Sequence, residues 1–186
     1  MVAMVQDPAI GSVPSSEGNI VHGGKNMTDR NAHMQALRDT GFWGRAAAGC
    51  LILARESGRI LIPHRSEHCQ QPNTWGTWGG AIDSGESPEE AVLRELAEEA
   101  GFAAPEEIIP LFVFEHQSGF RYHNFLVTVA AEFEPEINWE TQAFDWFHFG
   151  DWPEPAHFGL SALLSHAESA TILERRAVAL SRRYEG

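Results

Sequence analysis

The sequence predicts an α+β fold, a single domain in which a mixed β-sheet carries helices on both faces. Apolar segments of strand length lie before and after one helix that has complete boundary signals, and further helical periodicity follows the last strand. The 186 residues suit one medium-sized domain with a substantial core, and not comfortably two. Residues 1–40 are rich in turn-forming and polar residues, so we expect a flexible or loosely docked extension before a domain at 41–186.

Strand candidates open the domain. A short helix is expected near residues 29–38 of the extension, and the domain then begins with apolar strands at 46–54 and 60–65, joined by a tight turn at Ser57-Gly58. The segment at 67–74 is predicted as a loop. The sequence WGTWGG at 75–80 reads as a short strand that runs into a glycine bend.

The next element is a helix of about thirteen residues. Ser87 suits the N-cap, Pro88 suits the first helical position, and Glu90 completes a capping box with Ser87. Gly101 supplies the left-handed stop that ends many helices. The helix therefore has both of its ends specified by the sequence.

The second half of the chain contains three strand candidates and two helical patterns. The strands are expected at 108–116, 122–133 and 143–149, with a loop at 134–142 and a break at 150–155. One helical pattern then begins at Leu160 and a last amphipathic helix includes Leu173 and Ala177.

Charge and cysteine usage limit the class of protein. A formal net charge of −13 argues against broad attraction to nucleic acid or anionic membrane, although a local cation can still recruit a phosphorylated ligand. Two cysteines do not form a disulfide framework, which favours a reducing, cytoplasmic setting. The apolar stretch at 46–54 is too short to span a bilayer, and the first residues do not resemble a signal peptide.

The central helix has an unusual distribution of charge. At 100° per residue its apolar side chains share one arc, which we expect to face the core: Leu93, Leu96, Ala97 and Ala100. The opposite arc carries Glu95, Glu98 and Glu99, which repel one another by roughly 0.2–0.5 kcal/mol per pair and oppose the helix dipole. A solvated acidic face is one interpretation; a hard divalent cation bound by the carboxylates is the other.

The spacing of these residues resembles a known family signature. Gly80, Glu86 and the run at 94–102 match the Nudix box, GX5EX7REUXEEXGU, at every fixed position. Phe102 stands where an aliphatic residue is usual, which should affect packing rather than chemistry. The flanking order of strands and helices also resembles the Nudix domain. The resemblance implies a Nudix-type α/β/α sandwich around the mixed sheet.

The resemblance also implies a metal site. In Nudix hydrolases the box forms a loop–helix–loop that holds Mg²⁺ or Mn²⁺. On that pattern the metal ligands are Glu95, Glu98 and Glu99, with the backbone carbonyl of Gly80 as an addition. Arg94 would hold Glu86 or Glu95 in position, because a cation behind the ligands orients them.

The implied reaction is hydrolysis of a phosphoanhydride bond. Metal ions polarise phosphoryl oxygens and lower the pKa of bound water, and a carboxylate accepts the proton. The resemblance leaves the general base open among Glu98, Glu99 and Glu140, where Glu140 is equally well explained as a plain loop acid.

Other residues are candidates for contact with substrate. Arg65 ends a strand where many Nudix proteins have a basic residue facing the phosphates, and Arg45 and Arg121 are weaker candidates of the same kind. Trp75 and Trp78 could stack on a base, although core packing is the favoured role for at least one of them.

The resemblance leaves the substrate unspecified. ADP-ribose or another nucleotide sugar, a dinucleoside polyphosphate and a nucleoside triphosphate all contain a nucleoside diphosphate linked to another moiety. The alternatives are a catalytically silent nucleotide-binding regulator, and a hydrolase of RNA 5′ ends or of non-nucleotide diphosphates. No strong nucleic-acid binding is expected, and dimers are common among the relatives, so a homodimer is an open possibility.

Overall fold

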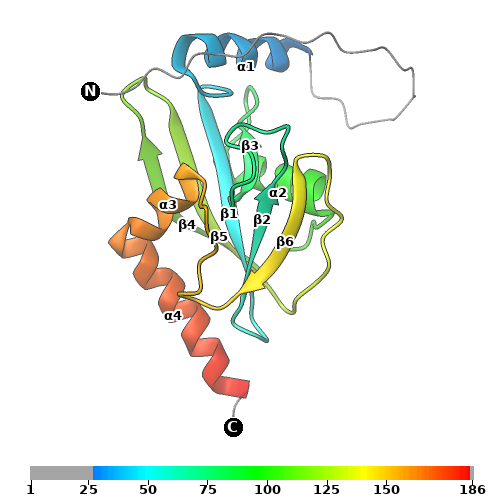
Figure 1. Ribbon diagram of the computed structural model, residues 1–186, viewed down its shortest axis with the longest axis vertical. Coiled ribbons are helices and arrows are strands. Elements are labelled where there is room, and N and C mark those ends of the chain that lie inside the picture. Colours follow the sequence, from blue (N-terminus) through cyan, green and yellow to red (C-terminus); the bar gives the residue numbers. More distant parts are fainter. Residues whose placement is uncertain (1–26, 185–186) are drawn as a thin grey trace.

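The structure, a computed structural model, describes residues 27–184 (Figure 1). The expected extension before residue 27 lies outside the described residues. The elements run along the chain as α1 (Met27–Thr40), β1 (Ala46–Ala54), β2 (Ile60–Arg65), β3 (Trp78–Ala81), α2 (Pro88–Ala100), β4 (Glu107–Glu115), β5 (Arg121–Val129), β6 (Thr141–Phe147), α3 (Phe158–Ser165) and α4 (Ala167–Tyr184).

The six strands form one mixed sheet in the order β4-β5-β1-β2-β6, with β3 paired to β1 beside that path. Strands β1 and β5 are parallel, and the other pairs are antiparallel. Strand β5 pairs with the whole length of one edge of β1. Strands β2 and β3 therefore share the opposite edge of β1. Residues 47–50 of that edge pair with β3, and residues 52–53 pair with β2. The sheet therefore forks where β2 and β3 diverge (Figure 1).

Helices cover both faces of the sheet, which confirms the predicted fold class. Helix α2 lies on one face, over a buried cluster that includes Cys50, Leu96 and Phe125. Helices α3 and α4 lie on the other face, over a second cluster that includes Leu51 and Leu173 (Figure 1). Alternate residues of β1 enter the two clusters, since successive side chains of a strand point to opposite faces.

The predicted boundaries of α2 are confirmed. Ser87 Oγ accepts a hydrogen bond from the Glu90 backbone N–H, and the Glu90 side chain accepts one from the Ser87 N–H, so the capping box is complete. Gly101 adopts the left-handed conformation at φ 63° and ends the helix. Local signals alone specify this element, because every boundary interaction lies within a few residues of the helix.

The predicted apolar arc of α2 was wrong in part. Leu96 and Ala100 are buried, but Leu93 is 37% exposed and Ala97 is also exposed. The buried face instead combines two adjacent i,i+4 rows: Val92, Leu96 and Ala100 in one, and Ala91, Glu95 and Glu99 in the other. The helix is thus rotated so that two of its carboxylates lie over the sheet, which an apolar-arc argument does not anticipate.

Helix α1 is longer than the one expected at 29–38, and it packs against the domain. His33 and Ala36 are buried, with Leu37 and Thr40 partly buried, at the i, i+3, i+4, i+7 spacing of a helix face. The helix lies across one end of the sheet, above β1 in Figure 1. This part of the extension is therefore a docked element of the fold.

The C-terminal pattern is divided into two helices. His166 has an extended backbone conformation and separates α3 from α4, and its Nδ1 lies 2.9 Å from Ser169 Oγ in the first turn of α4.

Across residues 27–184, no helix combines the length and apolarity that crossing a membrane requires.

The rotation of α2 can be tested with two leucines of the same helix. Leu96→Ala should lower the free energy of unfolding by about 2–5 kcal/mol, because Leu96 is fully buried. Leu93→Ala should cost less than about 1 kcal/mol, because Leu93 is partly exposed. Urea unfolding of both variants measures the difference, and equal losses would contradict the buried face described here.

Candidate functional site

The three acids at the end of α2 occupy different environments. Glu95 is 3% exposed and Glu99 is 7% exposed, whereas the side chain of Glu98 is 37% exposed. Glu95 and Glu99 follow Ala91 on the helix row that faces β3. Their burial is unusual, because carboxylates are almost never fully buried unless they are paired.

The glycines of β3 make room for these carboxylates. The Gly79 backbone N–H donates a 2.9 Å hydrogen bond to Glu99 Oε2. A Cβ atom on Gly80 would lie 2.5 Å from Glu95 Oε1, so any larger residue there would displace that carboxylate. Gly79 has φ +145°, and a Cβ there would overlap the carbonyl oxygen of Ala48. The bend is therefore built around two side chains of α2.

Arg94 contacts several of the surrounding acids and fixes their positions. Its guanidinium donates to both carboxylate oxygens of Glu86, at 2.8 and 2.9 Å, to Glu95 Oε1 at 2.6 Å, and to the carbonyl oxygen of Ala81 at 2.9 Å. Its Nη1 also lies 3.7 Å from Glu98 Oε2. Arg94 therefore contacts both glutamates, Glu86 and Glu95, between which the sequence left the choice open.

The electrostatic environment of Glu99 reflects this crowding. Burial raises the pKa of Glu99 well above its usual range, and the charges of Glu95 and Glu140 raise it further. The Gly79 N–H and the charge of Arg65 lower the pKa but do not offset the rise. A positive charge placed among these carboxylates would favour their ionised forms.

The donor set suits a hard divalent cation. Across residues 27–184, no three His, Cys, Asp or Glu side chains are gathered into a set that could hold a metal ion as they stand. Two features still match a metal: the acids offer only oxygen donors, and the small residue at Gly80 leaves the Glu95 carboxylate its space. Glu98, whose side chain is 37% exposed, supplies a third carboxylate on the same helix.

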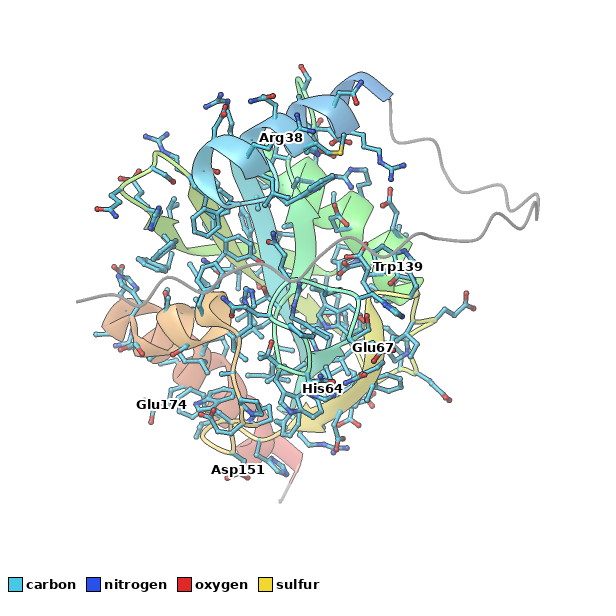
Figure 2. The ribbon with its side chains drawn as sticks, turned by 45° about the horizontal axis from the view of Figure 1, so that its top comes forward. Arg38, His64, Glu67, Trp139, Asp151 and Glu174 are labelled. Carbon is cyan, nitrogen blue, oxygen red and sulfur yellow. The ribbon has the colours of Figure 1, made fainter. Side chains whose placement is uncertain are left out.

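A cavity of about 1030 Å³ opens beside this cluster. Four of the residues singled out from the sequence line it: Gly80, Glu98, Arg65 and Glu140. Trp139, 60% exposed and labelled in Figure 2, lies on the wall next to Glu140. The structure thus brings one end of α2, the end of β2 and the loop before β6 to a single opening.

Arg65 and Glu140 reach the cavity from neighbouring segments. Arg65 Nε donates to the carbonyl oxygen of Gln70 at 3.1 Å, and the arginine side chain crosses the face of Gly76. The Glu140 carbonyl oxygen accepts a hydrogen bond from the Ser66 N–H at 2.8 Å, which ties the two loops together. Both side chains influence the pKa of Glu99, so both lie within electrostatic reach of the acids.

The two tryptophans before the box do not line the cavity. Trp78 is fully buried and its Nε1–H donates to the carbonyl oxygen of Leu61 at 3.3 Å, so core packing is its role and stacking on a substrate is not. Trp75 stacks on His64 with ring centroids 4.7 Å apart and packs edge-on against Phe147. Trp78 therefore has the core-packing role that was favoured for at least one of the two tryptophans, and stacking of Trp75 on a base stays a prediction.

Two candidate arginines also lie away from the cavity. The side chain of Arg45 is 75% exposed, with Nη2 3.5 Å from Asp39 Oδ2. Arg121 is 61% exposed and pairs with Glu115 at 3.2 Å. Neither arginine lines the cavity, because each forms an ion pair with an exposed acid instead.

Sequence reasoning missed the aromatic part of the cavity. Phe42 stacks on Phe120 with ring centroids 4.2 Å apart, and Phe158 meets Phe42 edge-on at 5.8 Å. Trp43 and the partly buried Tyr122 complete this part of the lining. A signal existed for α1, where Ala36 and Leu37 share a helix face with His33 and Thr40, but nothing local predicts that Phe42 meets Phe120 and Phe158, which lie far from it in the sequence.

Comparison with known proteins identifies the family. A family model described as NUDIX domain matches residues 43–166, which is most of the chain. The chain belongs to the Nudix family. The resemblance inferred from the box is therefore confirmed, and α1 lies outside the matched segment.

Individual relatives share shorter segments with this Nudix protein. "Putative 8-oxo-dGTP diphosphatase 3" of Mycobacterium tuberculosis is 48% identical over 67 residues, 34% of this chain and 31% of that protein. An 8-oxo-dGTP diphosphatase of Haemophilus influenzae is 38% identical over 73 residues, 39% of this chain and 52% of that protein. The chain thus spans about a third to a half of the length of these relatives.

Solved Nudix structures have the same fold. A Nudix hydrolase from M. Smegmatis gives a TM-score of 0.56 at 28% identity, covering 75% of this chain and 89% of that one. A MutT NUDIX hydrolase from Burkholderia pseudomallei gives 0.50 at 29% identity, covering 74% and 97%. These similarities agree with the mixed sheet between helices described above.

His157 lines the cavity, and its pKa gives a prediction of how the free energy of unfolding depends on pH. Burial, aided by the charge of Arg65, lowers the pKa of His157 from 6.5 to about 4. Between pH 6.5 and 4 the histidine is protonated in the unfolded chain but stays neutral in the folded one. The free energy of unfolding therefore falls by up to roughly 3 kcal/mol as the pH decreases toward 4. The variant His157→Asn keeps an acceptor for the Gly159 N–H. Its free energy of unfolding, measured with urea, should fall less between pH 6.5 and 4 than that of the wild type. Equal pH dependence in the two proteins would contradict this role of His157.

Proposed function

We propose that the protein is a metal-dependent hydrolase that cleaves a phosphoanhydride bond in a nucleoside diphosphate linked to another moiety. The observation that carries the proposal is the buried pair Glu95 and Glu99, oriented by Arg94 and Gly79 at the edge of a large cavity. Burying two carboxylates side by side is costly unless a cation completes them. A structural role alone would be served by apolar residues at both positions.

The metal-holding residues in this proposal are Glu95, Glu98 and Glu99, with the carbonyl oxygen of Gly80. Mg²⁺ or Mn²⁺ bound there would polarise the phosphoryl oxygens and lower the pKa of a coordinated water. Arg94 keeps Glu95 directed at the site through its 2.6 Å hydrogen bond. Its hydrogen bonds to Glu86 fix the guanidinium and also tie the preceding loop to the helix.

Arg65 and a carboxylate supply the remaining chemistry. Arg65 places a positive charge on the cavity wall of an acidic protein, where it would pair with a phosphate oxygen. The general base is a carboxylate facing the cavity. Glu98 and Glu140 both line it, and Glu99 lies within electrostatic reach of Glu140 and Arg65.

The substrate is proposed as a small nucleotide. The relatives named above are 8-oxo-dGTP diphosphatases, so nucleoside triphosphates come first in a substrate screen. ADP-ribose and other nucleotide sugars, and dinucleoside polyphosphates, complete the panel. RNA 5′ ends are disfavoured by the net charge of −13, which weakens binding to long polyanions.

Two further expectations belong to the proposal. Both cysteines are free thiols, with Cys50 buried and Cys69 at the cavity, and the reducing cytoplasmic setting stays a prediction. A homodimer stays a prediction. Analytical ultracentrifugation of the full chain measures it.

The proposed acids can be tested with carboxylate-to-amide substitutions. Glu98→Gln and Glu99→Gln should each lower metal-dependent turnover of the preferred nucleotide by about 100-fold or more, because each loses a ligand or a proton acceptor. Glu89→Gln on the exposed first turn of the same helix is the matched control and should keep wild-type turnover. Calorimetry with Mn²⁺ measures metal binding independently of turnover.

The outcomes separate the alternatives. Metal and nucleotide binding without turnover of any panel member would support the silent regulator and contradict the hydrolase. Equal turnover in Glu98→Gln and the wild type would remove Glu98 from the mechanism. Absence of Mn²⁺ binding to the wild-type protein, with nucleotide present, would refute the metal site itself.

Arg94 gives a separate prediction. Arg94→Lys keeps the charge but cannot reproduce the paired bonds to Glu86 together with those to Glu95 and Ala81. Mn²⁺ affinity and turnover should fall about 10- to 100-fold, because the ligand loses its orientation. An unchanged Mn²⁺ affinity measured by calorimetry would show that Arg94 serves only to join the loop to the helix.

A further inference from the structure

Helix α1 lies outside the segment that the NUDIX family model matches, yet it forms part of the cavity wall. Arg30, His33 and Leu37 all line the cavity from this helix. They are spaced at i, i+3 and i+7 and therefore share one face. A helix docked at this position contributes surface to whatever occupies the cavity.

The docking of α1 is specific. Ala36 is 1% exposed and His33 is 8% exposed, so both are packed against the domain. His33 Nε2 lies 3.5 Å from Asp83 Oδ1 in the loop that leads to α2. Asp83 Oδ2 in turn lies 3.9 Å from Arg94 Nε. The helix is thereby connected to the same loop that supports the acid cluster.

The far end of α1 leads into the aromatic part of the cavity. The Phe42 N–H donates to Thr40 Oγ1 at 3.1 Å, which turns the chain sharply after the helix. Phe42 then stacks on Phe120 and meets Phe158 edge-on. Leu37, Phe42 and Phe158 are each partly exposed and line the cavity, and Phe120, which is 3% exposed, also contributes to its lining.

The cavity therefore has two chemically different parts. One part is polar and contains Gly80, Glu98 and Arg65, where a diphosphate would lie under the proposed function. The other is apolar and aromatic, with Leu37 and Phe42 among its members. A flat, neutral heterocycle attached to a diphosphate matches both parts, since aromatic faces stack on bases and bury them well.

We propose that α1 is a specificity-determining element of this chain: Leu37, with Phe42 and Phe158, forms the wall against which the nucleobase of the substrate packs. The proposal rests on the proposed function, because the base reaches this wall only if its phosphates occupy the acidic part. Leu37 and Phe42 add a recognition surface from outside the segment that the family model matches, and Phe158 contributes to the wall from within that segment. The base is selected by a helix that the family signature does not contain.

Two residues of α1 provide a matched test. Leu37 lines the cavity, whereas Met34 is 37% exposed on the same helix and does not line it. Leu37→Ala should weaken binding of α,β-methylene ATP or GTP, measured by calorimetry with Mn²⁺, by about 10-fold, since a large apolar contact is lost. Met34→Ala should leave that affinity unchanged. Phe42→Leu, which keeps an apolar side chain, should weaken the same binding by removing the stacking face.

Inorganic tripolyphosphate, which has no base, is the second probe. Its affinity, and that of Mn²⁺ alone, should be unchanged in Leu37→Ala and Phe42→Leu. Wild-type nucleotide affinity in both variants, or an equal loss for tripolyphosphate, would overturn the proposal. If Mn²⁺ and tripolyphosphate bind the wild type but neither nucleotide analogue does, α1 does not recognise a base while the metal site stands; absence of Mn²⁺ binding would refute the proposed function instead.

Discussion

The placement of one guanidinium group governs the rest of the site. Arg94 bridges the loop before α2, the helix itself and the last residue of β3, through Glu86, Glu95 and the carbonyl oxygen of Ala81. Burial alone would lower the pKa of Arg94, but its hydrogen bonds to the Glu86 carboxylate and the charge of Glu95 raise that pKa above its ordinary value. The buried Glu95 carboxylate is tolerated here in part because its partner Arg94 stays charged and is itself held by hydrogen bonds to Glu86 and Ala81.

The small residues of β3 and α2 are the steric counterpart of that arrangement. Helix α2 approaches the sheet closely because Gly79, Gly80 and Ala91 present little or no side chain at the contact. Close approach lets a strand N–H reach Glu99 directly. The same closeness turns two acids toward the sheet, where an amphipathic helix normally places apolar side chains. Packing and the charge of the site therefore depend on the same few positions.

Sequence reasoning succeeded where the determining interactions are local. The capping box at Ser87 and the stop at Gly101 involve neighbours in the chain, and the strands have clear apolar runs, so the fold class followed. It failed where tertiary packing decides. Leu93 was expected on the buried arc of α2 but is 37% exposed, whereas Glu95 and Glu99 are buried against the sheet. The aromatic wall of the cavity joins Phe42, Phe120 and Phe158, whose proximity no local pattern encodes.

The fork in the sheet has a consequence for how such a protein can change over evolutionary time. Residues 66–77 leave the sheet at the end of β2 and return at β3, so both ends of this loop are anchored in strands that the core already holds. Doubling a loop's length costs only about 0.6 kcal/mol of closure entropy. His68, Cys69 and Gln70 on this loop line the cavity. Insertions there would reshape the opening while leaving the strand register intact, so the loop can change the ligand that the cavity accepts at little cost in stability.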